Sequence, residues 1–388
     1  MLAAGTTNNA SDQIRLTPIE VVSPSLAETI RLCPMQGGLS RERRLSCFVL
    51  GNPKGWLGNA YHEVLGRLSA AHTSERSLEA SVDVLWKTAV GRQHDRMKQH
   101  PLDLRFGEPA TWPGYNLAYA SLRARIREMY EGRTAGHACP EDRGPETGVL
   151  YEKDMRAFGG KLVGRPDVVC GSEVREYKTG NVFECVDGSD IQVVKDSYKR
   201  QLQVYGYLVK ENLGIWPSRG VLLPMSGGRI EVKLDPESCT RAATEAVSLL
   251  DAYNAGISAN SSERMASPSL GSCKWCQFKI LCPAFWKAAN PDWSGLLDGA
   301  AVECTVLEEL RRIHGGDAYS IAMEILGGSE QPRRIDLAPV SASIHQFPAA
   351  INKGAFVRIV GLRGRPDASL VPTIRTLGAR VDDLPVLT

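Results

Sequence analysis

One short stretch of the sequence, residues 163–180, restricts the fold more than any other part of the chain. Two runs of strand-forming residues flank the pair Gly171-Ser172. Glycine tolerates the positive φ that the first central position of a two-residue hairpin turn requires. If the turn lies there, the residues on either side pair with one another, beginning with Cys170 and Glu173. The stretch therefore predicts an antiparallel hairpin of defined register.

This register brings together charged side chains that a hairpin would normally keep apart. Counting back from the turn, Asp167 falls opposite Glu176 and Arg165 falls opposite Lys178. Opposed residues share a face of the sheet, as do residues two apart in one strand. Opposed carboxylates repel, but a divalent cation between them reverses the sign, and a neighbouring lysine can orient water or stabilise phosphate charge. The pattern indicates metal-assisted phosphodiester hydrolysis; the alternative is a solvated hairpin with scattered surface charge.

The sequence GRPD at 164–167, followed by EYKTG at 176–180, resembles the PD-(D/E)XK nuclease superfamily, and within it the RecB-like exonuclease branch. The resemblance implies an α/β fold of restriction-endonuclease type, in which helices flank a mixed central sheet. It also implies a bound Mg²⁺ or Mn²⁺ ion. The implied roles are Asp167 and Glu176 as metal ligands, Lys178 as the catalytic lysine, and the main-chain carbonyl of Tyr177 as a group facing the metal.

Two helical motifs have both a structural and a functional interpretation. His62 lies on a predicted helix over 56–68, and Gly58, one turn earlier, leaves space beside the imidazole. Gln201 and Tyr205 lie one turn apart on a later predicted helix. Taken alone, these residues are typical of packed or solvated helix faces. Because RecB-like nucleases carry a Gly-x-x-x-His helix and a Gln-x-x-x-Tyr helix in this order, the resemblance implies that His62 completes the metal shell. It implies that Gln201 and Tyr205 contact DNA and the active site.

A compact C-x₂-C-x₅-C segment is formed by Cys273, Cys276 and Cys282. Three thiolates complete neither a tetrahedral zinc site nor a cubane cluster, so a fourth ligand is needed, and Cys33 is the best candidate. Spacing alone leaves a structural Zn²⁺ site and an iron–sulfur cluster equally open. Iron–sulfur RecB-like nucleases, such as the CRISPR-associated exonucleases, carry one cysteine near the N-terminus before a proline and three after the core. The resemblance therefore implies a [4Fe–4S] cluster.

The rest of the sequence predicts three parts. Residues 1–20 predict a flexible N-terminal arm, and residues 21–290 a nuclease domain with a helical N-terminal part, closed by the cysteine segment. Residues 300–388, rich in short alternating segments, predict a small β-rich domain, OB-like in type. The predicted elements are helices over 23–32, 56–68, 77–99, 114–130 and 190–210, strands over 161–169, 174–179, 220–224, 229–234, 355–360 and 371–377, a loop over 132–148 and a flexible connector over 255–272.

The C-terminal part differs from the rest in charge. Residues 331–388 carry eight Lys or Arg but only four Asp or Glu, whereas the whole chain has a net charge of only +2. This excess favours a nucleic-acid-binding module, and an ordinary packing or oligomerisation domain is the alternative. The tetrapeptide GRPD recurs at 364–367 with no Glu-x-Lys after it, which indicates a turn and not a second site.

Composition excludes several classes of protein. With 43% hydrophobic and 23% charged residues, the chain is not disordered throughout. No apolar run approaches the ~18–20 residues of a membrane helix, and residues 1–15 lack the apolar core of a signal peptide. We therefore expect a cytoplasmic protein without a membrane partner, in which ten cysteines point to metal or cluster ligation.

Together these features predict a Mg²⁺- or Mn²⁺-dependent deoxyribonuclease, an exonuclease on single-stranded DNA ends that acts in DNA repair, recombination or defence. The sequence has no G-x-x-x-x-G-K-[ST] loop, so unwinding would come from a helicase or another repair or defence partner. The alternative is a non-catalytic DNA-binding or scaffold subunit with a nuclease-like fold and a structural zinc site. The opposed carboxylates argue against that alternative, since a scaffold does not need them.

Overall fold

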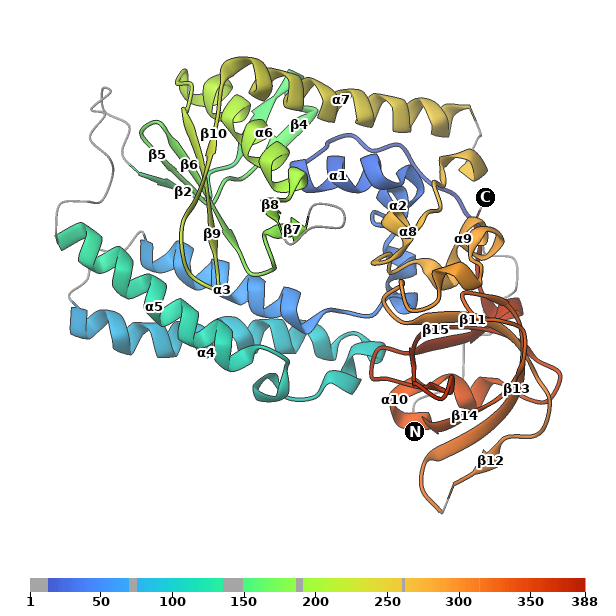
Figure 1. Ribbon diagram of the computed structural model, residues 1–388. Helices are drawn as coiled ribbons and strands as arrows, with labels where there is room; N and C mark the ends of the chain where they lie inside the picture. Colours follow the sequence, from blue (N-terminus) through green and yellow to red (C-terminus); the bar gives the residue numbers. More distant parts are fainter. Residues whose placement is uncertain are drawn as a thin grey trace.

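The computed structural model describes residues 13–69, 75–134, 149–185, 191–259, 262–313 and 315–387. They form a five-stranded sheet flanked by helices and, later in the chain, a seven-stranded sheet at the other end of the molecule (Figure 1). Most of the sequence before the first sheet is helical. The structure confirms the expected α/β class, with a mixed central sheet flanked by helices, a helical N-terminal part and a β-rich C-terminal part.

The five-stranded sheet holds the predicted hairpin at its centre. Its strand order is β10-β9-β6-β5-β2; β6 and β9 run parallel, and the other neighbours run antiparallel. Cys170 pairs with Glu173, and Gly171 between them has a φ of +56°, so the predicted turn and register are confirmed. The strands are β2 (Leu150–Tyr151), β5 (Val168–Cys170), β6 (Glu173–Lys178), β9 (Arg219–Pro224) and β10 (Ile230–Lys233).

Two small hairpins lie beside this sheet. They are β3 (Met155–Ala157) with β4 (Leu162–Gly164), and β7 (Phe183–Cys185) with β8 (Gln192–Val194). The helix predicted from residue 190 therefore begins later than expected, because residues 192–194 pair with β7 and α6 starts only at Asp196.

Helices cover both faces of the five-stranded sheet (Figure 1). Helices α3, α4 and α5 lie along one side, and α6 and α7 lie along the other. The four N-terminal helices predicted from periodicity are present as α1, α3, α4 and α5. Of the loop predicted over 132–148, residues 132–134 belong to α5 and residues 135–148 lie outside the described residues. The helices are α1 (Pro24–Leu32), α2 (Pro34–Leu39), α3 (Pro53–Ser69), α4 (Glu75–Lys98), α5 (Tyr115–Thr134), α6 (Asp196–Leu213), α7 (Pro236–Ser258), α8 (Leu270–Cys273), α9 (Pro283–Ala288) and α10 (Ala342–His345).

Helix α7 was not expected, although its start carries a recognisable signal. Asp235 caps it by accepting a hydrogen bond from the Ser238 N–H at 2.8 Å, and Pro236 occupies the first turn. The flexible connector predicted over 255–272 is therefore wrong at both ends, since α7 runs to Ser258 and α8 begins at Leu270. Small residues in this segment suggested flexibility, but earlier in α7 Ala242, Ala243 and Ala246 are buried and anchor the helix.

The segment before α1 is ordered from Gln13 on, which corrects the expectation of a flexible arm over 1–20. Strand β1 (Gln13–Ile14) pairs in parallel with β18 (Val386–Leu387). The side chains of Ile14, Leu16 and Ile19 are buried in the main hydrophobic core. Burial of apolar side chains stabilises this segment, despite its polar neighbours. Residues 1–12 lie outside the described residues.

The seven-stranded sheet has two packed faces. Its order is β12-β13-β11-β15-β16, with β14 beside β13 and β17 beside β15. Val302 and Ile359 lie in a core of its own, whereas Ala301 and Val360 on the opposite face join the main core. The sheet is thus fused to the rest of the protein by its second face. Its strands are β11 (Ala300–Val306), β12 (Arg311–Arg312), β13 (Ala318–Gly328), β14 (Arg334–Ser341), β15 (Phe356–Gly364), β16 (Leu370–Val371) and β17 (Leu377–Arg380).

The strand predicted over 371–377 is interrupted. Between β16 and β17 the chain turns, because the hydroxyl groups of Thr373 and Thr376 both donate to the carbonyl oxygen of Gly361, at 3.0 and 2.9 Å. The β-forming residues on either side had suggested one continuous strand. Within the turn, the Thr376 hydroxyl oxygen also accepts from the Thr373 N–H at 2.8 Å, and local hydrogen bonds of this kind compete with strand pairing.

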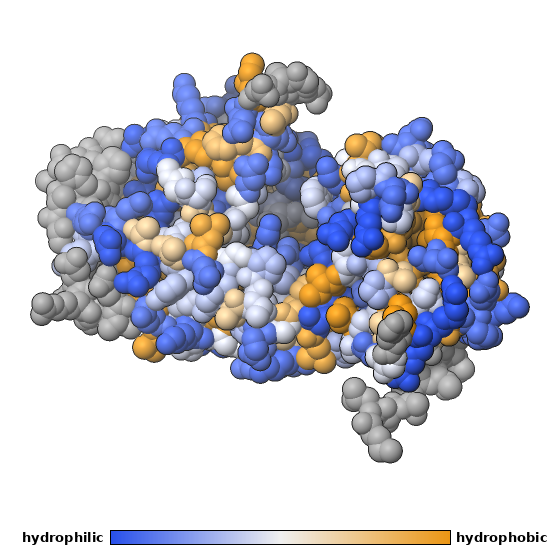
Figure 2. Space-filling model, turned by 60° about the horizontal axis from the view of Figure 1, so that its bottom comes forward, coloured by the Kyte–Doolittle hydropathy of each residue, from blue (hydrophilic) through white to orange (hydrophobic). Residues whose placement is uncertain are grey.

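The helical part of the molecule and the seven-stranded sheet meet at a polar contact as well as at the shared core. Arg105, in a 3₁₀ helix over Pro101–Phe106, donates to the carbonyl oxygens of Ile374 and Thr376 at 3.2 and 2.9 Å. The surface is hollowed between the half with the five-stranded sheet and the half with the seven-stranded sheet (Figure 2). No helix in the described part of the chain combines the length and apolar character of a membrane-spanning segment.

Candidate active site

The two carboxylates of the hairpin lie at the end away from its turn. Asp167 directly precedes β5, and Glu176 lies in β6 with its side chain buried. Val168 pairs with Arg175 at the end of the β5–β6 ladder, and Asp167 and Glu176 are the next residues beyond this pair. The main-chain N–H of Tyr177 donates to Asp167 Oδ2 at 2.6 Å, which orients this carboxylate.

Helix α3 adds the predicted histidine to this group. The His62 Nδ1 atom lies 3.1 Å from Asp167 Oδ1. Gly58 permits the approach, because a Cβ at this position would lie 3.0 Å from the Thr179 hydroxyl oxygen at the end of β6. The glycine one turn before the histidine therefore lets the helix contact the strand that carries Glu176.

A hydrogen-bonded group joins Glu176 to helix α6. Lys178 Nζ donates to Glu176 Oε1 at 3.0 Å and to Gln201 Oε1 at 2.6 Å. The Gln201 amide nitrogen donates to Glu176 Oε1 at 2.8 Å and to the Tyr205 hydroxyl at 3.1 Å. Helix α6 is held close to the sheet, since a Cβ on Gly220 of β9 would lie 2.9 Å from Leu202.

Burial and the repulsion between the two carboxylates shift the pKa values of the site. Burial, with the nearby charge of Asp167, raises the pKa of Glu176 to about 7, although Lys178 opposes the rise. Burial disfavours the imidazolium form of His62. Its hydrogen bond to Asp167 and the negative charges of Asp167 and Glu176 nevertheless raise the pKa of His62 above its ordinary value. Excess negative potential of this kind attracts a cation.

The donor atoms are of the type that a hard divalent cation prefers. Glu176 Oε2 is buried and has no hydrogen-bond partner among the described residues, and it accompanies the Asp167 carboxylate and the His62 imidazole. Such a buried acceptor is costly unless something binds it. No group of three or more His, Cys, Asp or Glu side chains in the described ranges is already arranged around a metal position. In this arrangement Lys178 supplies the positive charge next to Glu176.

The structure thus brings together every residue predicted for the hairpin site: His62, Asp167, Glu176, Tyr177, Lys178, Gln201 and Tyr205. Gln201 and Tyr205 are buried, and their hydrogen bonds run to each other and to the Glu176–Lys178 pair. Their contact with DNA stays a prediction.

One residue of the site was not anticipated from the sequence. The Lys178 ammonium lies over the ring of Tyr198, 4.5 Å from its centroid. Tyr198 precedes Gln201 by three residues in α6, so both lie on one face of the helix. That spacing was the available signal.

The end of α1 lies beside the segment that leads into α8, since the Ser267 N–H donates to Cys33 Sγ at 3.5 Å. Burial raises the pKa of the Cys276 thiol to about 12, with a further contribution from Cys273 and Cys282. Burial likewise raises the pKa of Cys282, to which Cys33 and Cys273 add. Among the described residues no three Cys, His, Asp or Glu side chains are grouped closely enough to hold a metal ion, so a shared ligand set for these cysteines stays a prediction.

Comparisons with known proteins place this geometry in context. The family model described as the PD-(D/E)XK nuclease superfamily matches residues 21–283, which include the carboxylate hairpin. A crystal structure from Eubacterium rectale, described as a "Putative exonuclease", is 10% identical, with a TM-score of 0.36, over 62% of this chain and 82% of that chain. No curated protein matches the sequence significantly.

Proposed function

This chain belongs to the PD-(D/E)XK nuclease superfamily, and we propose that it is a metal-dependent DNA nuclease of the RecB-like branch, acting as an exonuclease on single-stranded ends. The observation that carries the proposal is the convergence of Asp167, Glu176, Lys178 and His62, with one buried oxygen of Glu176 left without a partner. A hard-cation donor set beside a basic side chain is what metal-assisted phosphodiester hydrolysis requires.

The metal-binding residues in this proposal are Asp167, Glu176 and His62, with the main-chain carbonyl of Tyr177 as a further ligand. When bound, Mg²⁺ or Mn²⁺ supplies Lewis acidity at the phosphate and lowers the pKa of a water molecule. The N–H of Tyr177 holds Asp167 Oδ2, so the carboxylate keeps one orientation. His62 contacts the other oxygen of the same carboxylate.

Lys178 positions the attacking water and stabilises the negative charge that develops on the phosphate. Its ammonium is shared between Glu176 and Gln201 and lies over Tyr198, so few other positions are open to it. Tyr205 in turn fixes the Gln201 amide. Preorganised charge of this kind lowers the barrier because it needs little rearrangement during the reaction.

The substrate and setting follow from the family resemblance. RecB-like sites generally thread one strand, which favours single-stranded DNA ends, and the branch acts in DNA repair, recombination or defence. The hollow between the two halves of the molecule is consistent with a path for a strand (Figure 2). In this proposal residues 21–290 form the nuclease domain, residues 300–388 a nucleic-acid-binding domain, and a helicase or other repair or defence partner supplies single strands.

The cysteines support a second element of the proposal, a [4Fe–4S] cluster bound by Cys33, Cys273, Cys276 and Cys282. Their spacing in the sequence and the contact of Cys33 with Ser267, just before α8, support a shared ligand set, and a structural Zn²⁺ site is the alternative. In either case the metal would link the end of α1 to the segment that leads into the seven-stranded sheet.

Degradation of end-labelled single-stranded DNA with Mn²⁺ tests the nuclease proposal. The wild-type protein should degrade the strand, and Asp167→Ala should lose at least about a thousand-fold in rate, since it removes a metal ligand. Equal degradation by both proteins, or none by either, would contradict the proposal. Binding of DNA without cleavage would favour the scaffold alternative.

Absorbance and metal analysis of the purified protein test the cluster. A brown protein that absorbs near about 400 nm and contains iron is expected of thiolate-bound iron. Cys276→Ser should lose both. A colourless protein with stoichiometric zinc would instead identify a structural zinc site.

A further inference from the structure

A cavity separate from the active site lies where the seven-stranded sheet meets the segment that follows the cysteines. Its volume is about 770 Å³, within the range of small-molecule and cofactor sites. Its lining comes from residues 294–300, from Glu330 and from the β15–β17 region, 361–375. It includes most of the second GRPD sequence, which we had interpreted as a simple turn. None of the active-site residues lines it.

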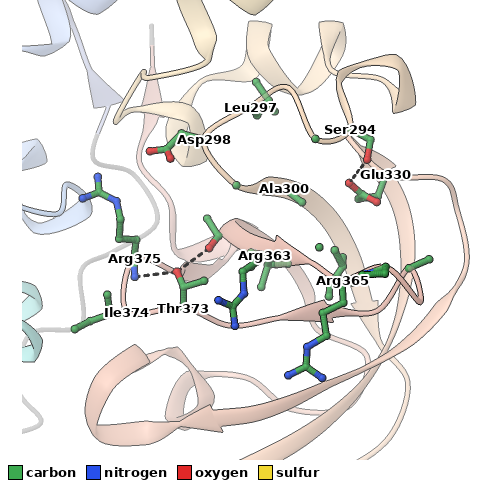
Figure 3. Close-up of a pocket in the computed structure, with 18 residues that line it drawn as sticks. Ser294, Leu297, Asp298, Ala300, Glu330, Arg363, Arg365, Thr373, Ile374 and Arg375 are labelled. Atoms are coloured by element: carbon green, nitrogen blue, oxygen red, sulfur yellow. Dashed lines mark hydrogen bonds between the residues drawn. The ribbon is translucent and has the colours of Figure 1, made fainter. Parts of the chain in front are cut away.

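Three arginines line this cavity: Arg363, Arg365 and Arg375 (Figure 3). All three are exposed, and none forms an ion pair with a carboxylate of the described residues within salt-bridge distance. Arg363 and Arg365 are two residues apart at the end of β15, so they extend on the same side of the chain. In Figure 3 the end of Arg375 extends to a different side from those of Arg363 and Arg365, so the three unpaired guanidinium groups suit separate phosphates of an extended polyanion.

The two acidic residues of the lining have other partners. Glu330 accepts a hydrogen bond from the Ser294 hydroxyl at 2.8 Å and lies 3.7 Å from Arg333, outside the arginine set. The charge of Asp298 acts on the buried ammonium of Lys279. In Figure 3 Glu330 and Ser294 lie on the opposite side of the cavity from the ends of Arg363 and Arg365. Among the described residues, no carboxylate of the lining lies within ion-pair distance of the three arginines.

Glycines form part of the wall beside the arginines, together with apolar side chains such as Leu362 and Ile374. Gly299 and Gly361 have φ values of +82° and +79°, and a Cβ on Gly299 would lie 2.7 Å from the Gly361 Cα. These glycines let β11 and β15 approach each other at the cavity floor. Gly364 completes the lining on the arginine side. A polyanion can therefore reach main-chain groups as well as guanidinium groups.

An exposed tryptophan lies in the segment that is hydrogen-bonded to the cavity wall. The carbonyl oxygen of Lys274 accepts a hydrogen bond from the Asp298 N–H at 3.2 Å, which joins the cysteine segment to the cavity wall. Trp275, the next residue, is 69% exposed, and the Lys274 ammonium lies 5.4 Å from its ring centroid. An exposed indole beside cationic groups is typical of surfaces on which unpaired bases stack, and a duplex offers no unstacked base.

We propose that this cavity is a second nucleic-acid site, which binds the phosphodiester backbone of a single strand through Arg363, Arg365 and Arg375 while a base stacks on Trp275. The inference rests on the proposed function in one respect, since it takes the bound polyanion to be the strand that the nuclease cleaves. The site would hold the strand at a distance from the reacting phosphate. It would therefore contribute to the binding of long substrates and not to the chemical step.

Fluorescence anisotropy with long fluorescein-labelled oligo(dT), without added divalent metal, tests the site in the full-length protein. The double variant Arg363→Gln/Arg375→Gln should weaken binding about ten-fold or more. The slope of log K against the logarithm of the salt concentration should become less steep by about 1.4, because two phosphate contacts are lost. Trp275→Ala should weaken binding about five-fold or more. The matched control, Arg311→Gln/Arg334→Gln, removes the same charge from the same sheet, where these arginines pair with Asp336 and Glu308. It should bind like the wild type.

Two further measurements separate the outcomes. Hydrolysis of bis(p-nitrophenyl) phosphate, which is too small to span both sites, should be unchanged in the cavity variants, and thermal unfolding should show that they fold. Asp167→Ala should keep oligo(dT) binding and lose hydrolysis. If neither the wild type nor any variant hydrolyses a substrate, the nuclease proposal fails, but the binding comparison still tests whether the cavity binds a strand. Wild-type binding by Arg363→Gln/Arg375→Gln, or equal weakening in the control, would overturn the inference. Equal loss of affinity for a duplex would overturn its single-strand part.

Discussion

Gln201 is the residue on which the order of the active site most depends. Its amide contacts Glu176, Lys178 and Tyr205, so one side chain sets the positions of a carboxylate and an ammonium. Because Gln201 is buried, water does not readily replace these hydrogen bonds. A positioning residue of this kind acts through its neighbours, and its loss should change the rate without removing the metal ligands.

Gln201→Ala should lower kcat for single-stranded DNA by about 10- to 100-fold, the usual effect of removing a hydrogen-bond partner of a metal ligand. The metal concentration for half-maximal rate should rise as well, because Glu176 is no longer held. Gln203→Ala on the same helix is the matched control, and its rate should equal that of the wild type. Equal kcat values in both variants would show that Gln201 contributes to packing and does not position the catalytic groups.

His62 makes a separate prediction at the same scale. An imidazole binds a metal ion in its uncharged form. His62 would therefore contribute affinity for the metal, whereas the negative charge of the ligand set comes from the carboxylates. His62→Ala should therefore raise the Mn²⁺ concentration for half-maximal activity by about ten-fold or more, with activity recovered at high Mn²⁺. Chelation with EDTA should abolish the activity of both proteins. An activity that excess Mn²⁺ cannot restore in His62→Ala would assign the histidine a role other than metal binding.

The sequence could predict these residues because short motifs carry them. Asp167, Glu176 and Lys178 follow from a two-residue turn and a register, which are local properties. The carboxylates share a face by strand geometry alone. The distance from Lys178 to Tyr198 depends instead on how α6 packs on the sheet, which no local pattern reports.

At the scale of elements, the contact between α3 and the end of β6 decides whether the histidine meets the carboxylate. The helix approaches through Gly58, opposite Thr179. Glycine inside a helix costs up to about 1 kcal/mol relative to alanine, so close approach offsets a loss of intrinsic helix stability. The glycine therefore belongs to the geometry of the site.

Gly58→Val should displace α3, because the added side chain would meet Thr179. We expect a loss of about 1–3 kcal/mol in the free energy of unfolding and about 100-fold in activity from the misplaced His62. Gly91→Val is the matched control in α4, since nothing lies within 4 Å of a Cβ there. Its stability should lie within about 0.5 kcal/mol of the wild type. Thermal unfolding and the nuclease assay measure both effects, and equal behaviour of the two variants would contradict the packing argument.

Element prediction failed where side chains outside the segment decide its structure. Helix α7 was missed although its sequence carries both signals, the Asp235-Pro236 cap and an apolar stripe that includes Cys239, Ala246 and Leu250. Strand β1 is too short to be recognised alone and exists because β18 lies beside it. Such partners come from the far end of the chain.

At the scale of the whole molecule, the seven-stranded sheet is an integral part of the structure. Leu297, Ala301, Val360 and Leu377 lie in the same buried cluster as the five-stranded sheet. Arg105 adds a charge-assisted contact from the helical part to the turn between β16 and β17. Burial lowers the pKa of Arg105 to about 10, which still leaves it charged at neutral pH. The two halves should therefore unfold together.

Arg105→Met should weaken this junction, because two main-chain carbonyls lose a charged donor. The expected loss is about 1–3 kcal/mol, and amide exchange should increase at residues 373–377 before it increases in the five-stranded sheet. Arg96→Met, at an exposed position of α4, should leave both unchanged. Unchanged exchange at 373–377 in Arg105→Met would show that the shared core alone holds the junction.

The two-residue turn at Gly171-Ser172 also limits how the protein can vary in length. Side chains alternate between the faces of a strand, so one residue added to a single arm of the hairpin would turn Asp167 or Glu176 away from its partner. Only additions in steps of two residues to each arm keep both carboxylates opposed and on the face toward His62. The length of the hairpin is therefore constrained. Relatives that retain the chemistry should have arms of the same length, or arms that differ by an even number of residues.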